Sequence, residues 1–115
     1  MADANVEVLR GTLDLLILKA VSWRPTHGYA VARWIEQATG DVLQIEEGSL
    51  YPALHRLERQ KLITARWELS PNKQRTRVYR LTPAGRRQLV SERSRWQRFV
   101  EAMAGVLSKP ETSES

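Results

Sequence analysis

The chain has 115 residues, of which 42% are hydrophobic and 27% charged, with a formal net charge of +5. This length suits one compact domain with an extension, and the composition excludes general disorder. Cysteine is absent, residues 1–8 lack the plan of a secretory signal, and no apolar run approaches the roughly 18 residues of a membrane span. We therefore expect a cytoplasmic protein without disulfides or thiolate chemistry.

The first predicted helix covers residues 11–23. Leu13 and Ile17 begin an apolar face at helical spacing, while Leu15 and Leu18 make much of the opposite side apolar as well. A helix that is apolar nearly all round is buried on both faces. We therefore expect Leu15 and Leu18 to contact a second subunit.

A second helix is predicted over residues 29–39, after a break at 24–28 that contains proline and glycine. Trp34 and Ile35 lie on its apolar face, and Gly40 is expected to end it as a C-cap.

The third predicted helix runs from about residue 48 to 61. Proline is tolerated in the first turn of a helix, where its missing N–H has no helical partner, so Pro52 places the start within two residues of Ser49. A buried stripe of three leucines lies on one face. The opposite side is expected to carry Ser49, Pro52, Arg56 and Arg59, with Tyr51 and His55 beside them.

Alternation with a period of two predicts a half-buried strand over residues 63–69, whose inward set is Ile63, Ala65, Trp67 and Leu69. Turn-forming residues follow at 70–75, and 76–81 is the returning strand, so the two strands form a hairpin. The hairpin tip is basic, and three cations at alternate positions share one side: Lys73, Arg75 and Arg77.

Thr82 followed by Pro83 predicts the start of a helix that continues to residue 107. Its apolar residues recur at heptad-like spacing and extend beyond any core that a chain of this size supplies, so we expect them to bury against a partner subunit. The predicted dimer residues of this helix are Leu89, Trp96, Phe99, Val100, Met103, Val106 and Leu107.

These elements predict a mainly α fold with a small β-hairpin: a winged helix-turn-helix over residues 9–81 and a dimerisation helix over 82–107. Residues 1–8 and 108–115 are expected to be flexible tails. Between Leu54 and Arg98 there are thirteen Lys and Arg but only three Glu, and this excess suits either a polyanionic partner or a solubilising surface.

An α-helix fits the major groove of DNA and contacts base edges with its N-terminal residues. The third helix beside a basic hairpin matches this arrangement. Arg56 suits either a guanine or a phosphate, and the alternative role for Tyr51 and Pro52 is to shape the helix start.

Four segments resemble PadR-type transcriptional regulators, in the short form with a single C-terminal helix: Leu9–Asp14, His27–Tyr29, Glu47–Glu58 and Tyr79–Gly85. The resemblance implies a bacterial repressor that binds a palindromic operator as a homodimer. It also implies DNA contacts from Ser49, Tyr51, Pro52 and Arg56 and from the wing residues Lys73, Arg75 and Arg77. Gln74 and Val78 depart from the usual wing sequence of that family.

Trp96 lies in the middle of the predicted dimer seam. It suits interface packing, or, by the same resemblance, stacking of a small aromatic or hydrophobic effector. No cofactor, metal site or catalytic set is predicted, because His27 and His55 lie on different elements without paired carboxylates. Two other functions remain open: a winged-helix module that docks proteins rather than DNA, and RNA binding, which the lack of an aromatic sheet platform disfavours.

Overall fold

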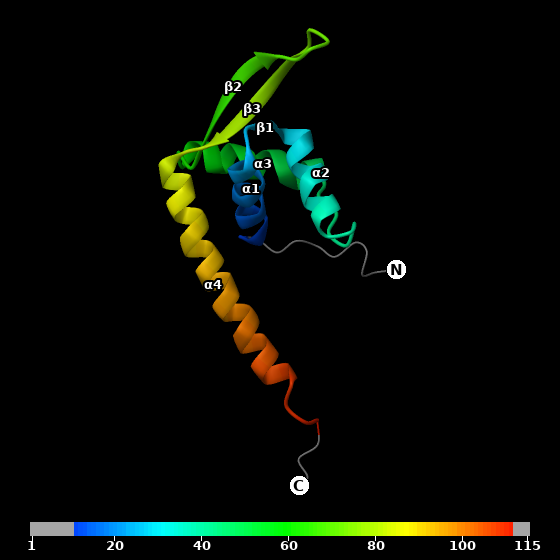
Figure 1. Cartoon of the computed structure of the whole chain (residues 1–115), viewed down its shortest axis with the longest axis vertical. Helices are drawn as coiled ribbons and strands as arrows, with labels where there is room; N and C mark the ends of the chain where they lie inside the picture. Colours follow the sequence, from blue (N-terminus) through cyan, green and yellow to red (C-terminus); the bar gives the residue numbers. More distant parts are fainter. Residues whose placement is uncertain (1–10, 112–115) are drawn as a thin grey trace.

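The computed structural model describes residues 11–111. The tail predicted over 1–8 lies outside the described residues, as do the last four residues of the other predicted tail. The described chain has four helices and one three-stranded sheet, and Figure 1 shows the long last helix leaving the body of the molecule. The elements are α1 (Thr12–Trp23), β1 (Thr26–His27), α2 (Gly28–Ala38), α3 (Glu47–Arg59), β2 (Ile63–Leu69), β3 (Arg75–Leu81) and α4 (Pro83–Leu107).

The fold class predicted from the sequence is confirmed. Helix α1 packs against α2, α3, α4 and β3, which makes it the centre of the core. Its residue Ile17 is fully buried, as are Val31 of α2 and Leu54 of α3. The base of the hairpin closes the core with Ile63 and Tyr79. Among the described residues, no helix combines the length and the apolar composition that crossing a membrane requires.

The sheet has the order β1-β3-β2, and both pairings are antiparallel. Strand β1 was missed at the sequence level, where residues 24–28 were expected only to interrupt two helices. Thr26 pairs with Tyr79 and His27 with Val78, so this short strand joins the start of α2 to the hairpin. The imidazole Nδ1 of His27 also accepts a hydrogen bond from the Ala30 N–H at 3.4 Å, which caps α2.

Helix α3 begins at Glu47, within the expected two residues of Ser49, but Pro52 lies in the second turn rather than the first. The ring has no N–H to donate to the carbonyl of Gly48 four residues earlier. Because Gly48 is exposed, its carbonyl can bond to water instead. The helix therefore continues through Pro52 to Arg59.

The junction between the hairpin and α4 fixes the direction of the long helix. The Thr82 hydroxyl accepts a hydrogen bond from the Gly85 N–H at 2.9 Å and lies 2.8 Å from the carbonyl oxygen of Lys61. The Thr82 N–H donates to the carbonyl of Leu62 at 3.1 Å. A Cβ at Gly85 would lie 2.0 Å from that same carbonyl oxygen, so only glycine fits in this contact.

Candidate nucleic-acid interface

The outward stripe of α3 is rotated from the one expected. Successive helical residues are about 100° apart, so the residues opposite the buried leucines are Gly48, Pro52, His55 and Arg59. All four are exposed. Ser49 and Arg56, predicted to lie on the outward stripe, lie on its flank, because the centre of the stripe is opposite the buried leucines.

Arg56 is tied to α1. Its Nη2 lies 2.6 Å from Asp14 Oδ1 and its Nε 3.4 Å from Asp14 Oδ2, a two-point contact between half-buried side chains. The guanidinium therefore holds α3 against α1. This pairing joins positions 42 residues apart, and its only trace in the sequence is one acidic residue within the apolar first helix.

Tyr51 lies on the other flank of α3, over the first residue of α2. A Cβ at Gly28 would come within 2.9 Å of Tyr51 Cε1 and 3.3 Å of its hydroxyl oxygen. The missing side chain of Gly28 thus makes room for the ring, which is 37% exposed. Tyr51 is therefore placed at the joint between α2 and α3 and still reaches solvent.

The hairpin projects beyond the core (Figure 1), and this corrects the interpretation of its inner face. Trp67 and Leu69 were assigned to the inward set, yet they are 55% and 67% exposed, because the core ends at Ala65 and Tyr79. On β3 the same face carries Arg75 and Arg77, opposite Leu69 and Trp67 respectively.

The wing cations differ in their surroundings. Lys73 lies at the tip of the turn, with a φ of 65°, and Arg75 is exposed. Arg77 is half-buried, and its Nη2 lies 2.8 Å from Glu58 Oε2 of α3, so it links the wing to that helix. Within residues 11–111 the buried Arg77 Nε has no hydrogen-bond partner.

Tyr79 lies beneath this link. Burial raises the pKa of its hydroxyl, the Arg77 guanidinium opposes the rise, and the Glu58 carboxylate adds to it. The buried phenol stays neutral at physiological pH and supports Arg77 from the core side.

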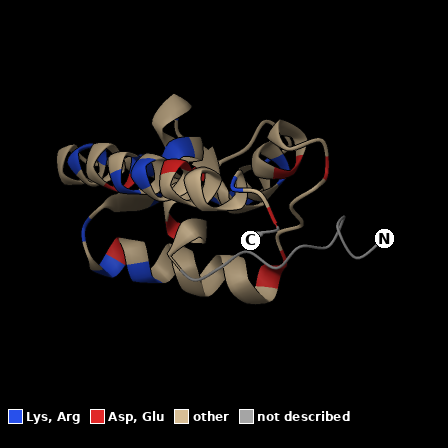
Figure 2. Ribbon diagram, turned by 90° about the horizontal axis from the view of Figure 1, so that it is seen from below, with Lys and Arg blue, Asp and Glu red and all other residues tan. Residues whose placement is uncertain are grey.

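Positive charge extends past α3 and the wing. Figure 2 shows blue segments recurring along α4, interleaved with red ones. Five of the thirteen cations between Leu54 and Arg98 belong to this helix: Arg86, Arg87, Arg93, Arg95 and Arg98. The other eight belong to α3, the hairpin and their connection.

The long helix carries an apolar stripe that no described residue covers. Its members are 39–74% exposed: Trp96, Phe99, Val100, Met103, Val106 and Leu107. Two other predicted dimer residues, Leu18 and Leu89, are instead buried in the chain's own core, so they have no surface to offer a partner. Leu15 is half-buried and packs against that core.

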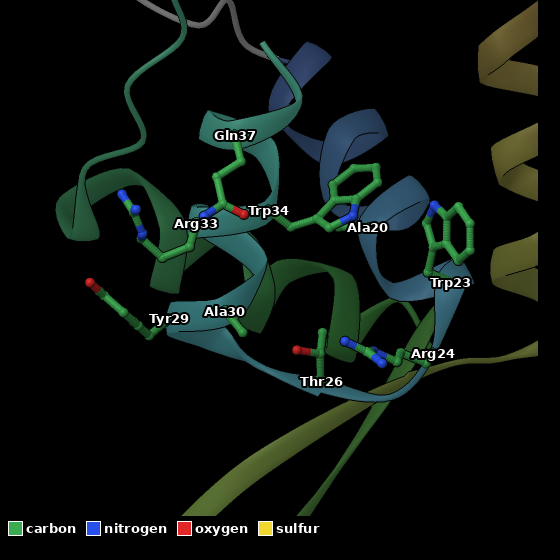
Figure 3. A pocket seen from close by; sticks show the side chains of 9 residues that line it. All are labelled: Ala20, Trp23, Arg24, Thr26, Tyr29, Ala30, Arg33, Trp34 and Gln37. Atoms are coloured by element: carbon green, nitrogen blue, oxygen red, sulfur yellow. The ribbon is translucent and has the colours of Figure 1, made fainter. Parts of the chain in front are cut away.

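An aromatic groove of about 520 Å³ lies between α1 and α2, and no sequence pattern predicted it (Figure 3). Trp23 and Tyr29 on its walls are 68% and 60% exposed. All of its lining residues lie between positions 20 and 37, so the groove is separate from the apolar stripe of α4. Within residues 11–111 there is no group of three or more His, Asp or Glu that could hold a metal ion.

Comparison with known proteins gives consistent matches. The model of the family described as "Transcriptional regulator PadR-like family" matches residues 17–91. The transcriptional regulator Rv3488 of Mycobacterium tuberculosis is 32% identical over 100 residues, which cover 86% of this chain and 89% of that protein.

Two solved structures extend the match to the fold. A PadR family transcriptional regulator from Eggerthella lenta has a TM-score of 0.75 and 30% identity, over 88% of this chain and 86% of its own. A PadR-like transcriptional regulator from Bacillus cereus has a TM-score of 0.77 and 25% identity, over 89% and 97% of the two chains.

Proposed function

The chain belongs to the PadR-like family of transcriptional regulators, which are not enzymes, and from that premise we propose that it is a homodimeric repressor of a palindromic operator. The observation that carries the proposal is the placement of the exposed side of α3 beside the basic wing, with Glu58 and Arg77 joining the two. Such a repressor acts in the bacterial cytoplasm, on double-stranded DNA.

We assign the contacts from exposure and pairing. Ser49, Tyr51 and Pro52 are exposed on the N-terminal half of α3, from which a helix reaches base edges, and the exposed His55 follows one turn after Tyr51. Phosphate contacts suit the exposed cations farther from the start of α3: Arg59 on the helix, and Lys73 and Arg75 on the wing. Arg56 and Arg77, both ion-paired within the chain, position α3 and the wing instead.

The apolar stripe of α4 supports the homodimer. An exposed stripe of this length on a projecting helix is typical of an interaction site, and a second copy offers a complementary stripe. Two-fold symmetry then requires an operator with two inverted half-sites, about 34 Å apart or a multiple of that. In this proposal residues 9–81 contact DNA and residues 82–107 join the subunits.

In this proposal Trp96 packs in the dimer interface. It lies 5.7 Å from Phe99 between ring centroids, so the two rings form one aromatic surface in the middle of the stripe. A small aromatic or hydrophobic effector that stacks there would release the repressor by changing the dimer.

The test is binding of the full chain to duplex DNA from the region upstream of its own gene. We expect preference for the palindromic duplex over a scrambled one, and a logarithm of affinity that falls linearly with the logarithm of salt concentration. The control is Gln97→Ala, an exposed polar residue on α4 outside every proposed DNA contact, which should bind as the parent does. A chain that binds no duplex at any salt concentration contradicts the proposal and favours a protein-docking module.

A further inference from the structure

Trp67 is the residue of the wing that the fold itself does not explain. It lies on β2 beyond the end of the core, and more than half of its surface is exposed. An indole at such a position gains little from burial and is costly to expose. Its neighbours show what it does.

Two guanidinium groups lie over the indole ring. The Arg75 Cζ is 4.7 Å from the ring centroid and the Arg77 Cζ is 5.5 Å from it, both within the range of a cation–π interaction. The strand register explains the meeting, because Trp67 pairs directly with Arg77 and lies diagonally from Arg75 on the same face of the hairpin.

The two arginines differ in what else they bind. Arg77 is held at a second point by Glu58 of α3, at 2.8 Å. Arg75 has no ion pair among residues 11–111, so the ring is what orients it. Stacking occupies the flat face of a guanidinium and leaves its N–H edge free, and that edge is the part that donates to a phosphate.

We propose that Trp67 is a positioning residue of the wing, which holds Arg75 with its N–H groups free for a DNA phosphate, while Glu58 holds Arg77 as the link to α3. The proposal rests on the proposed function, because it needs the wing to contact DNA. It has Trp67 act through the phosphate contact of Arg75 rather than on the DNA.

The experiment is a double-mutant cycle on the full chain with Trp67→Leu and Arg75→Ala. Leucine keeps an apolar side chain on the strand but lacks the aromatic face. Affinity is measured at several salt concentrations for a random duplex of about 30 base pairs, since a phosphate contact is independent of sequence.

We expect Arg75→Ala to lower the salt slope by about one, and Trp67→Leu to weaken binding by roughly three- to tenfold. The double variant should bind no more weakly than Arg75→Ala alone, because the ring acts only through that arginine. Trp67→Phe, which restores an aromatic face, should recover most of the affinity. Leu69→Ala, a more exposed apolar residue on the same strand face, is the matched control and should change little.

The outcomes separate the two proposals. If Arg75→Ala leaves both affinity and salt slope unchanged, the wing contact that the proposed function assigns to Arg75 fails, and the role of Trp67 fails with it. If Arg75→Ala weakens binding but Trp67→Leu does not, the role of Trp67 alone is overturned. Losses that add in the double variant also overturn it, because they mean that the indole acts on binding independently of Arg75.

Discussion

Gly28 determines where Tyr51 lies, although the two residues belong to different helices. An alanine there would place its methyl group 2.9 Å from Tyr51 Cε1, so the ring must move. We expect Gly28→Ala to reduce the preference for operator over random duplex, because Tyr51 leaves its position at the α2–α3 joint. Competition between the two duplexes measures this. Stability should change by less than about 1 kcal/mol, since alanine also favours the helix.

Gly105→Ala is the control for that substitution. It makes the same change within a helix, where an added Cβ meets nothing within 4 Å. It should leave DNA preference unaltered. If Gly28→Ala also leaves the preference unaltered while Tyr51→Ala abolishes it, the ring tolerates displacement and Gly28 has only a packing role.

The burial of individual side chains was harder to predict than the helices and strands to which they belong. The periodicity correctly placed Ile63 in the core, but it assigned Trp67 to the same inward set, although the core ends before the strand does. Leu18 was assigned to the dimer because α1 is apolar nearly all round, yet α2, α3, α4 and β3 of the same chain surround that helix. Alternation gives the face of a residue, while exposure also depends on which other elements reach it.

Arg56 links α3 to α1, although its predicted role was a contact with DNA. The structure pairs it with Asp14, so we expect Arg56→Gln to lower the free energy of unfolding by about 1 kcal/mol or less, as befits a half-exposed pair. The slope of DNA affinity against salt should not change, because no phosphate contact is lost. A slope that falls by about one would instead place Arg56 on a phosphate. Arg59→Gln, an exposed neighbour on α3, should show that fall.

The α3–β2 connection and the start of α4 form a close contact at Gly85. We expect Gly85→Ala to destabilise the fold by roughly 1–3 kcal/mol, because the new methyl group would lie 2.0 Å from the Leu62 carbonyl oxygen and the backbone must shift. Thermal or urea unfolding measures it. Gly105→Ala, in the open part of the same helix, should be neutral or stabilising. Equal stabilities for the two variants would mean that the junction relaxes freely.

Most elements were predictable because each has its own period and its own end signals. Thr82 and Pro83 correctly predicted the first residue of α4. Alternation correctly predicted both ends of β2. Strand β1 was not predictable, since two residues contain no period and its partner lies about 50 positions away. The ion pair of Arg56 escaped for the same reason: long-range partners leave no local pattern.

The molecule is more extended than a compact chain of the same length. Its radius of gyration is 17.1 Å, against about 13 Å for a compact chain of this length, and its extents are 68 × 33 × 20 Å. The wing and α4 account for the difference, since both leave the body (Figure 1). The sequence predicted the apolar stripe of α4 but not the aromatic groove, whose residues come from α1, β1 and α2.

The stripe gives the last prediction, which concerns the assembly. Met103 and Val106 are 44% and 71% exposed on the projecting half of α4, away from the core. We expect the pair of substitutions Met103→Glu and Val106→Glu to leave the fold intact and to produce monomers in sedimentation, because four carboxylates would meet across a two-fold interface. Affinity for a palindromic duplex should then fall to that for a single half-site, since the second contact is no longer intramolecular.

Ser94→Glu is the matched control for this assembly test. It adds a carboxylate to the exposed face of the same helix, opposite the stripe, and should leave both the dimer and DNA binding unchanged. A Met103→Glu, Val106→Glu variant that still sediments as a dimer would exclude the stripe as the interface. Binding to two inverted half-sites would then require another contact between subunits. The aromatic groove between α1 and α2 would be the next exposed apolar surface to test by substitution.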